Sequence, residues 1–201
     1  MQIYNFPNIG YIMNTLTDEE LQPIRHEVDE IQSTFETAQT VNHSYAGAIK
    51  KEYEIIKSKA LLEDLILPMK HAFTECFHVP AYESSGELFI KQAWVNFQKA
   101  GEFMAPHTHN GDYGFALYLK VPFTLQDELD HLSTPTKTAN QCSSFVLYYT
   151  DAMGHVKPEF IPIDKNWENT VIFFPGTMLH SVQPFFTSSD YRITISGTIQ
   201  K

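Results

Sequence analysis

Hydrophobic and polar residues follow two different rhythms along this chain. Between residues 17 and 77, apolar residues recur at spacings of three and four, which predicts amphipathic helices. The first helix follows Thr17-Asp18-Glu19-Glu20, a sequence of the capping-box type. The second begins near Ser58, and Pro68 should kink or divide it because proline cannot continue the backbone hydrogen-bond pattern.

From residue 87 onward, the pattern changes to short apolar or alternating runs between turn residues, which is typical of strands. These runs cover residues 87–97, 113–121, 143–149, 158–163, 170–174, 180–184 and 191–199. Seven short strands within roughly 110 residues predict a sandwich or barrel. We therefore expect an α+β chain that is mainly β and has N-terminal helices. Residues 42–47 and 126–141 are predicted loops that cover something or form a lid.

Length and patterning favour one domain, with residues 1–86 as helical support and residues 87–201 as the β core. The formal net charge is −10 and no Lys/Arg run is present, so nucleic-acid binding is disfavoured. There is no apolar stretch of membrane-spanning length and no signal-peptide pattern. We expect a soluble, intracellular, cytoplasmic protein with no membrane partner, in which Cys76 and Cys142 stay reduced. The sequence does not indicate an oligomeric state.

Candidate metal ligands cluster where predicted strands meet turns. His107 and His109 are two residues apart, so on a strand they point to the same face. His180 follows a tight Pro175-Gly176 turn and opens the next strand. Imidazole suits iron and other transition metals. The other histidines lack a second ligand-type residue in such a setting and are interpreted as surface or hydrogen-bonded residues: His26, His43, His71, His78, His131 and His155.

Arg192 heads an alternating strand and shares one face with Thr194, whereas the chain's only other arginine, Arg25, lies on the polar side of the first helix. An inward guanidinium requires an anion, because an unpaired buried charge is costly. A ligand carboxylate could pair with Arg192 through two hydrogen bonds, with the Thr194 hydroxyl as an additional donor. The alternative is an ion pair with Asp190 or another acidic residue at the barrel rim.

Several short motifs occur in an order that resembles the Fe(II)/2-oxoglutarate-dependent oxygenase superfamily, especially microbial and phage oxygenases distantly similar to prolyl hydroxylases. The resemblance covers about residues 87 to 199. The motifs are Trp94-Val95-Asn96, Gly101, Pro106-His107-Thr108-His109, Tyr118-Leu119-Lys120-Val121-Pro122, Phe173-Phe174-Pro175-Gly176, Leu179-His180-Ser181-Val182-Gln183-Pro184 and Arg192-Ile193-Thr194-Ile195-Ser196.

This resemblance implies a double-stranded β-helix that holds Fe(II), with 2-oxoglutarate and O2 as co-substrates. His107 and His180 match the superfamily's two metal-binding histidines, and Arg192 matches the arginine that holds the far carboxylate of 2-oxoglutarate. Tyr118 matches a tyrosine that hydrogen-bonds this carboxylate in prolyl hydroxylases.

The sequence departs from the superfamily pattern where an Asp is usual, because His109 stands there. Three completions of the metal site are open: His109 as third ligand, Asp112 reaching back from its glycine-containing turn, or water. If His109 is not a ligand, it could still orient water or substrate. Four aromatic residues either line the pocket or only fill the core: Trp94, Phe115, Tyr148 and Phe174.

The resemblance implies a dioxygenase that hydroxylates a peptide side chain or a small molecule and releases succinate and CO2. The main alternative is a non-catalytic, cupin-like protein that binds a metal or a small acid. A metal-free, carbohydrate-binding jelly roll is a third reading, which the aromatic content permits.

Overall fold

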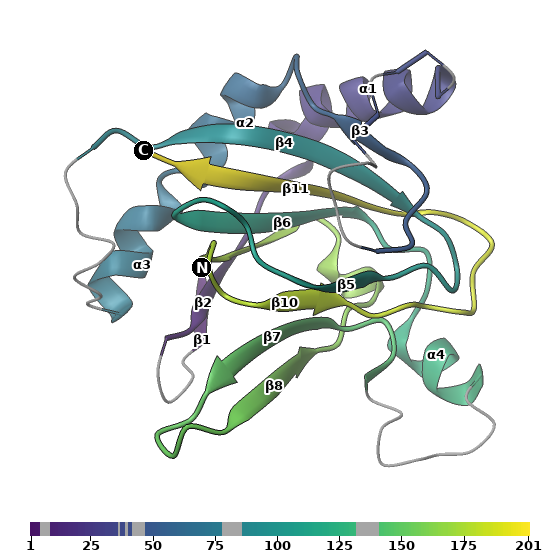
Figure 1. Cartoon of the computed structure of the whole chain (residues 1–201). Coiled ribbons are helices and arrows are strands. Elements are labelled where there is room, and N and C mark those ends of the chain that lie inside the picture. Colours follow the sequence, from purple (N-terminus) through teal and green to yellow (C-terminus); the bar gives the residue numbers. More distant parts are fainter. Residues whose placement is uncertain (5–8, 36, 39, 42–46, 78–85, 132–140) are drawn as a thin grey trace.

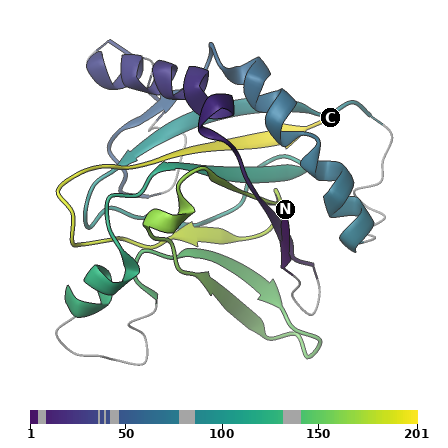
Figure 2. The same ribbon diagram turned by 180° about the vertical axis from the view of Figure 1, so that it is seen from behind.

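Two antiparallel sheets form the framework of the molecule. The computed structural model describes residues 1–4, 9–35, 37–38, 40–41, 47–77, 86–131 and 141–201. The larger sheet has strand order β1-β2-β9-β6-β11-β4-β3, and the smaller has order β5-β10-β7-β8. Helices α1, α2 and α3 cover one face of the larger sheet, and the smaller sheet lies toward its other face (Figures 1 and 2). The predicted fold class, a mainly β jelly roll with helices, is confirmed.

The elements have the following bounds. The strands are β1 Gln2–Tyr4, β2 Tyr11–Thr15, β3 Glu52–Glu54, β4 Phe89–Gln98, β5 Met104–His107, β6 Tyr113–Lys120, β7 Phe145–Thr150, β8 Val156–Ile161, β9 Thr170–Pro175, β10 His180–Val182 and β11 Arg192–Gln200. The helices are α1 Asp18–Ser33, α2 Lys59–Ile66, α3 Met69–Phe77 and α4 Leu125–His131.

The N-terminal helices form where the pattern predicted them. The Thr17 hydroxyl accepts a hydrogen bond from the Glu20 N–H at 3.2 Å, and the Glu20 carboxylate accepts one from the Thr17 N–H at 2.7 Å. This is the predicted capping box. Pro68 lies between α2 and α3, so it divides the second helix as expected.

The predicted loop at residues 126–141 begins instead as a helix, which corrects the expectation for its first part. Thr124 and Asp127 cap α4 reciprocally, with hydrogen bonds of 3.2 and 3.3 Å. The buried Glu128 carboxylate then accepts N–H groups from Phe186 and Thr187, which fixes α4 to the body of the protein. Residues 132–140 and most of the predicted loop at 42–47 lie outside the described residues.

All seven predicted strands are present, but the sequence pattern missed β1, β2, β3 and β5. Three of these belong to the first 86 residues and join the larger sheet, so this part of the chain is more than helical support. Strand β2 pairs with β9 from Ile12↔Phe173 to Thr15↔Thr170. Strand β3 has only three residues, with glutamates on both sides of Tyr53. A segment this short does not show a recognisable alternation of apolar and polar residues.

Side chains alternate between two apolar cores across the larger sheet. Phe173 packs toward the helices, in a cluster with Leu21 and Phe73, while Ile172 and Phe174 pack between the sheets with Phe145. Burial of each such side chain contributes about 1.5–3 kcal/mol. Cys76 and Cys142 form no disulfide, as expected. Within the described residues, no helix is long and apolar enough to cross a membrane.

We predict that Glu52 makes the fold less stable as pH rises. Glu52 is 2% exposed, and burial, with a smaller contribution from Glu102, raises its pKa from the ordinary 4.5 to about 7. The folded protein therefore holds this proton more tightly than the unfolded chain. Stability conferred by the proton is present below the unfolded pKa and is lost as pH rises through the folded pKa, a loss of up to about 3 kcal/mol.

Chemical denaturation of wild type and Glu52→Gln, from about pH 5 to about pH 8, measures this effect. The free energy of unfolding should fall less steeply with pH in the variant, because it has no proton to lose. Glu87→Gln, at an exposed glutamate, controls for the removal of one carboxylate. Parallel pH profiles of wild type and Glu52→Gln would contradict the prediction.

Candidate metal centre

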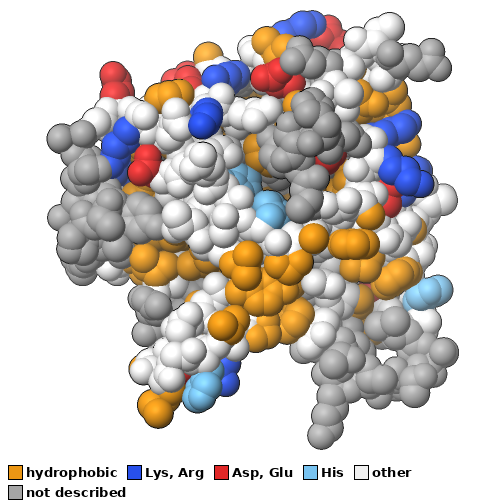
Figure 3. Space-filling view, viewed as in Figure 1, with side chains coloured by type: hydrophobic (Ala, Val, Ile, Leu, Met, Phe, Trp, Pro, Cys, Tyr) orange, Lys and Arg blue, Asp and Glu red, His pale blue; other side chains and the backbone are white. Residues whose placement is uncertain are grey.

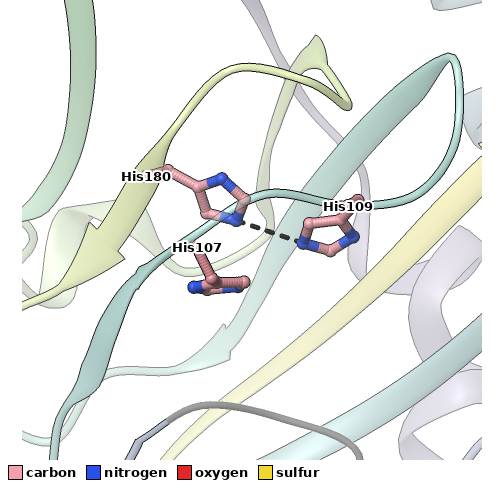
Figure 4. A group of neighbouring side chains, drawn as sticks. All are labelled: His107, His109 and His180. Carbon is pink, nitrogen blue, oxygen red and sulfur yellow. Dashed lines mark hydrogen bonds between the residues drawn. The ribbon is translucent and has the colours of Figure 1, made fainter.

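Three histidines meet at the mouth of the space between the sheets. His107 ends β5 and pairs with His180, the first residue of β10. His109 follows in the loop after β5, where its backbone N–H donates to Gly176 O at 2.8 Å. One ligand-type nitrogen from each ring lies within 4.8 Å of the others (Figure 4). The Nε2 atoms of His109 and His180 are 3.1 Å apart. The three side chains could therefore hold a metal ion.

A hydrogen bond to Nδ1 fixes each imidazole. His107 Nδ1 lies 2.7 Å from Ala105 O, and His180 Nδ1 lies 2.9 Å from Met178 O. A carbonyl oxygen only accepts, so Nδ1 carries the proton in both rings and Nε2 keeps its lone pair. His109 Nδ1 lies 2.8 Å from the Thr198 hydroxyl, which can accept or donate. The contact between the two Nε2 atoms is a hydrogen bond when His109 Nε2 donates to His180 Nε2 and His109 Nδ1 accepts from Thr198 (Figure 4). When Thr198 accepts instead, the Nε2 lone pairs of His109 and His180 both face the short space between them.

Burial keeps the three imidazoles neutral. Loss of hydration is the largest cause that lowers the pKa of His107, and it lowers the pKa of His109 to about 3. The pKa of His180 also lies well below its ordinary value, chiefly through burial and then through the neighbouring His109 and His107. Neutral imidazole is the form that binds metal ions, so the site is in its ligating state at neutral pH.

Aromatic rings surround the histidines and restrict their rotation. Trp94 stacks on His109 with centroids 5.5 Å apart and an interplanar angle of 21°. On the other side, Phe174 meets His180 edge to face at 4.7 Å, and Phe145 stacks on His180 at 5.6 Å. These contacts and the Nδ1 hydrogen bonds hold the rings in one arrangement before any ligand arrives.

Two glycines allow the histidine-bearing loops to approach each other. A Cβ on Gly176 would lie 2.4 Å from Gly111 O, and a Cβ on Gly111 would lie 2.6 Å from Ile199 O. A backbone hydrogen bond joins the two loops at this point, from Gly176 N to Asp112 O at 2.9 Å. The Asp112 carboxylate accepts from Lys201 N at 3.1 Å and is not part of the histidine cluster. Of the proposed protein ligands, the structure thus brings together His107, His109 and His180.

The histidines open into a pocket between the two sheets. Histidine side chains are visible in a hollow on the face drawn in Figure 3, beside an apolar area of the surface. The described residues that line the pocket carry no Lys, Arg, Asp or Glu side chain. They are Ile49, Trp94, Asn96, Gln98, Met104, His107, His109, Phe115, Ala116, Tyr118, Phe145, Phe174, His180, Val182, Thr194 and Ser196.

A row of polar side chains crosses the floor of this pocket. Thr194 of β11 lies opposite Asn96 of β4 on one side and Tyr118 of β6 on the other. Asn96 Nδ2 donates to the Thr194 and Ser196 hydroxyls at 3.3 and 3.2 Å. The buried Asn96 Oδ1 has no hydrogen-bond partner within the described part of the chain, so it can accept from a ligand or water.

Arg192 lies just behind the pocket, and its surroundings correct one expectation. The guanidinium is fully buried, and its partners are neutral oxygens of Gln98, Ser143 and Gln183. Asp190 pairs instead with Lys120 at 2.7 Å. The alternative of an ion pair with Asp190 is therefore not formed, and the expectation that the guanidinium requires an anion as its direct partner is corrected, because three neutral acceptors hold it. Tyr118 lies on the pocket side, and burial raises its pKa.

The sequence pattern indicated the three histidines but not several polar residues around them. Trp94, Phe115 and Phe174 line the pocket, whereas Tyr148 is absent from its lining and its hydroxyl lies 3.2 Å from the Ser181 hydroxyl. The missed residues are Asn96, Gln98, Ser196 and Thr198. The sequence feature that could have indicated them is the presence of polar residues at alternate positions of two otherwise largely apolar strands, because alternate residues of a strand point to the same face.

The remaining described histidines lie away from the cluster, which agrees with their interpretation as surface or hydrogen-bonded residues. Exposed His26, His71 and His155 each face a nearby carboxylate, and His131 stacks on Phe186. His43 and His78 lie outside the described residues.

Comparison with known proteins identifies the fold. No family model matches the chain, and no curated protein matches its sequence. A prolyl-4-hydroxylase from Pseudomonas putida superposes with a TM-score of 0.56 at 12% identity, covering 96% of this chain and 93% of that one. The viral collagen prolyl hydroxylase of Paramecium bursaria Chlorella virus 1, solved with 2-oxoglutarate, gives 0.51 at 13% identity and 94% coverage of both chains.

A third structure shows that the similarity is not limited to hydroxylases. The non-haem α-ketoglutarate-dependent epimerase SnoN from nogalamycin biosynthesis gives a TM-score of 0.55 at 13% identity, covering 96% of this chain and 77% of that one. These matches share the double-stranded β-helix that the sequence resemblance implied. The chain has the fold of the 2-oxoglutarate- and Fe(II)-dependent oxygenases, with three histidines that could hold a metal at its mouth.

Proposed function

We propose that this protein is an Fe(II)- and 2-oxoglutarate-dependent dioxygenase that hydroxylates a peptide side chain or a small molecule. The observation that carries the proposal is the cluster of three neutral imidazoles, each fixed through Nδ1, in a pocket of this fold. Fe(II) with 2-oxoglutarate and O2 would supply the oxidation, in which a substrate C–H becomes C–OH while 2-oxoglutarate becomes succinate and CO2.

The donor set suits a first-row transition metal. Imidazole nitrogen is a ligand for iron, nickel, copper and zinc, so the three rings fit Fe(II) without being specific for it. His107, His109 and His180 would hold the ion from the strand ends and the adjoining loop. Three protein ligands leave positions available for co-substrate and oxygen, as catalytic metal sites require.

The other residues of the site would position and shield the reactants. Thr198 and the carbonyls of Ala105 and Met178 hold the imidazoles by Nδ1. Trp94, Phe145 and Phe174 form an apolar wall around the rings, which keeps bulk water from the site. We assign the Tyr118 and Thr194 hydroxyls, which line the pocket, to hydrogen bonds with the co-substrate.

Charge and lining together favour the proposed substrate class. The net charge of −10 opposes a polyanionic substrate such as nucleic acid. Apolar residues, including Ile49, Met104 and Val182, make up part of the pocket lining and suit a carbon-rich group. A peptide side chain or a small metabolite satisfies both conditions.

We predict that removing one histidine sharply reduces metal affinity. Titration of Co(II), with its visible absorption as the signal, should show binding at least about 100-fold weaker in His107→Ala and His180→Ala, since each loses a direct ligand. His155→Ala, at an exposed histidine beside Asp151, is the matched control and should bind Co(II) like wild type. Unchanged affinity in folded His180→Ala would exclude this cluster as the metal site.

Thr198 tests the role of the Nδ1 hydrogen bonds separately from direct ligation. Thr198→Val keeps the side-chain shape but removes the hydroxyl beside His109, so we expect Co(II) affinity to fall by about 10- to 100-fold. Thr198→Ser restores the hydroxyl and should recover most of this affinity. Equal affinities in wild type, Thr198→Val and Thr198→Ser would show that His109 needs no such support.

The co-substrate is tested by spectroscopy and product analysis. Anaerobic addition of 2-oxoglutarate to the Fe(II)-loaded protein should produce a metal-to-ligand absorption band, and admission of O2 should yield succinate. Both signals should be lost in His107→Ala. Retained Fe(II) binding with neither the band nor succinate would favour the alternative function, a cupin-like protein that binds a metal or small acid without turnover.

A further inference from the structure

Arg192 donates all of its recorded hydrogen bonds to neutral oxygens beside the pocket. Its Nε and Nη2 atoms donate to Gln98 Oε1 at 3.0 and 2.6 Å. Nη1 donates to Ser143 O at 2.9 Å, and Nη2 also donates to Gln183 O at 3.1 Å. The Nε and Nη2 edge, which is the edge that best matches a carboxylate, is therefore covered by one neutral amide oxygen.

This arrangement gives a buried guanidinium only neutral hydrogen-bond partners, while the charge of the buried Glu128 carboxylate acts on Arg192 without a hydrogen bond to it. Within the described residues, the structure records no ion pair between Arg192 and a carboxylate. Burial is the largest cause that lowers the pKa of Arg192, to about 10, so the side chain remains charged at neutral pH. Hydrogen bonds to a carboxylate are roughly twice as strong as those to neutral oxygens, so an arriving carboxylate competes well for this edge.

Gln98 is the residue that separates Arg192 from the pocket. It lies directly opposite Arg192 in the pairing of β4 with β11, and its side chain lines the pocket, whereas Arg192 does not. Its carboxamide also donates through Nε2 to Glu102 O at 2.5 Å, in the turn that follows β4. Rotation of this one side chain would expose the guanidinium edge to the pocket without any change in the strands.

We propose that Gln98 is a latch on Arg192: its carboxamide oxygen occupies the guanidinium edge that the far carboxylate of a dicarboxylate co-substrate needs, and it must leave this edge for that carboxylate to bind. This inference rests on the proposed function, because the co-substrate must reach the histidine site. Gln98 thereby acts as a positioning residue, since its carboxamide oxygen satisfies the buried guanidinium until a carboxylate replaces it. It also sets the affinity for the far carboxylate, because its hydrogen bonds must be broken first.

Two substitutions of Gln98 give opposite expectations. Gln98→Ala removes the competing oxygen, so 2-oxoglutarate should bind on the order of fivefold to tenfold more tightly, corresponding to the loss of modest neutral hydrogen bonds. Gln98→Glu places a permanent carboxylate on the same edge with nearly the same shape. It should weaken 2-oxoglutarate binding by at least about 100-fold, because two carboxylates would compete for one guanidinium.

The experiment is anaerobic calorimetric titration of the Co(II)-loaded protein with 2-oxoglutarate and, separately, with pyruvate. Pyruvate shares the keto-acid end of 2-oxoglutarate but lacks the far carboxylate. Its affinity should therefore be the same in wild type, Gln98→Ala and Gln98→Glu. Gln92→Ala, a half-buried glutamine of the same strand outside the pocket lining, is the matched control. It should leave the affinities for both ligands unchanged.

Several outcomes would overturn the latch. Weaker 2-oxoglutarate binding in folded Gln98→Ala would mean that Gln98 helps to hold the ligand. If Gln98→Glu binds 2-oxoglutarate as tightly as wild type, the far carboxylate does not contact Arg192. The same conclusion would follow if the Gln98 variants changed the affinity for pyruvate as much as the affinity for 2-oxoglutarate. If Gln98→Ala does not fold, the near-isosteric Gln98→Glu still decides the matter. Failure of the proposed function would give a result distinct from failure of the latch. Wild-type protein would then bind Co(II) without binding 2-oxoglutarate, or would not bind Co(II) at all.

Discussion

The candidate site depends on the hydrogen bonds that hold the Nδ1 atoms of three buried imidazoles. Two of the partners are backbone carbonyls, at Ala105 and Met178, and the third is the Thr198 hydroxyl. Carbonyl acceptors fix the tautomer, and burial keeps the rings neutral, so Nε2 of His107 and His180 is a lone-pair donor before any metal arrives. The pairing of His107 with His180 and the close approach at Gly176 then fix the distances between the rings.

The two sheets contribute different chemistry to the pocket. The smaller sheet and its adjoining loop supply the histidines, while the inner face of the larger sheet supplies hydroxyl and amide groups at alternate positions of β4 and β11. Behind this polar row lies Arg192, whose hydrogen-bond partners in the described part of the chain are all neutral oxygens. The pocket thus combines three neutral imidazoles that could hold a metal with a positive charge set back from its surface, and we propose that this arrangement suits an anion that also chelates a metal.

The sequence predicted the parts of this structure that depend on local pattern. The spacing of apolar residues predicted seven strands and the first helix. The capping sequence at Thr17 and the backbone chemistry of Pro68 predicted where helices begin and divide. Short strands such as β3 were not predicted, because they form through pairing with a strand distant in sequence and not through a local pattern of apolar residues. The histidine spacing indicated a metal site, but backbone carbonyl partners leave no trace in a sequence. Likewise, the direction of the Asp112 carboxylate and the contact of Gln98 with Arg192 arise only when distant segments meet.

The most direct test of the central claim is X-ray absorption spectroscopy of the Fe(II)-loaded protein, because outer-shell scattering counts the imidazoles on the metal. We predict three imidazole ligands in wild type and two in His109→Ala. The three imidazoles of wild type should also stay bound when 2-oxoglutarate is added. A wild-type spectrum with two imidazoles and a carboxylate, unchanged by His109→Ala, would contradict the three-histidine centre.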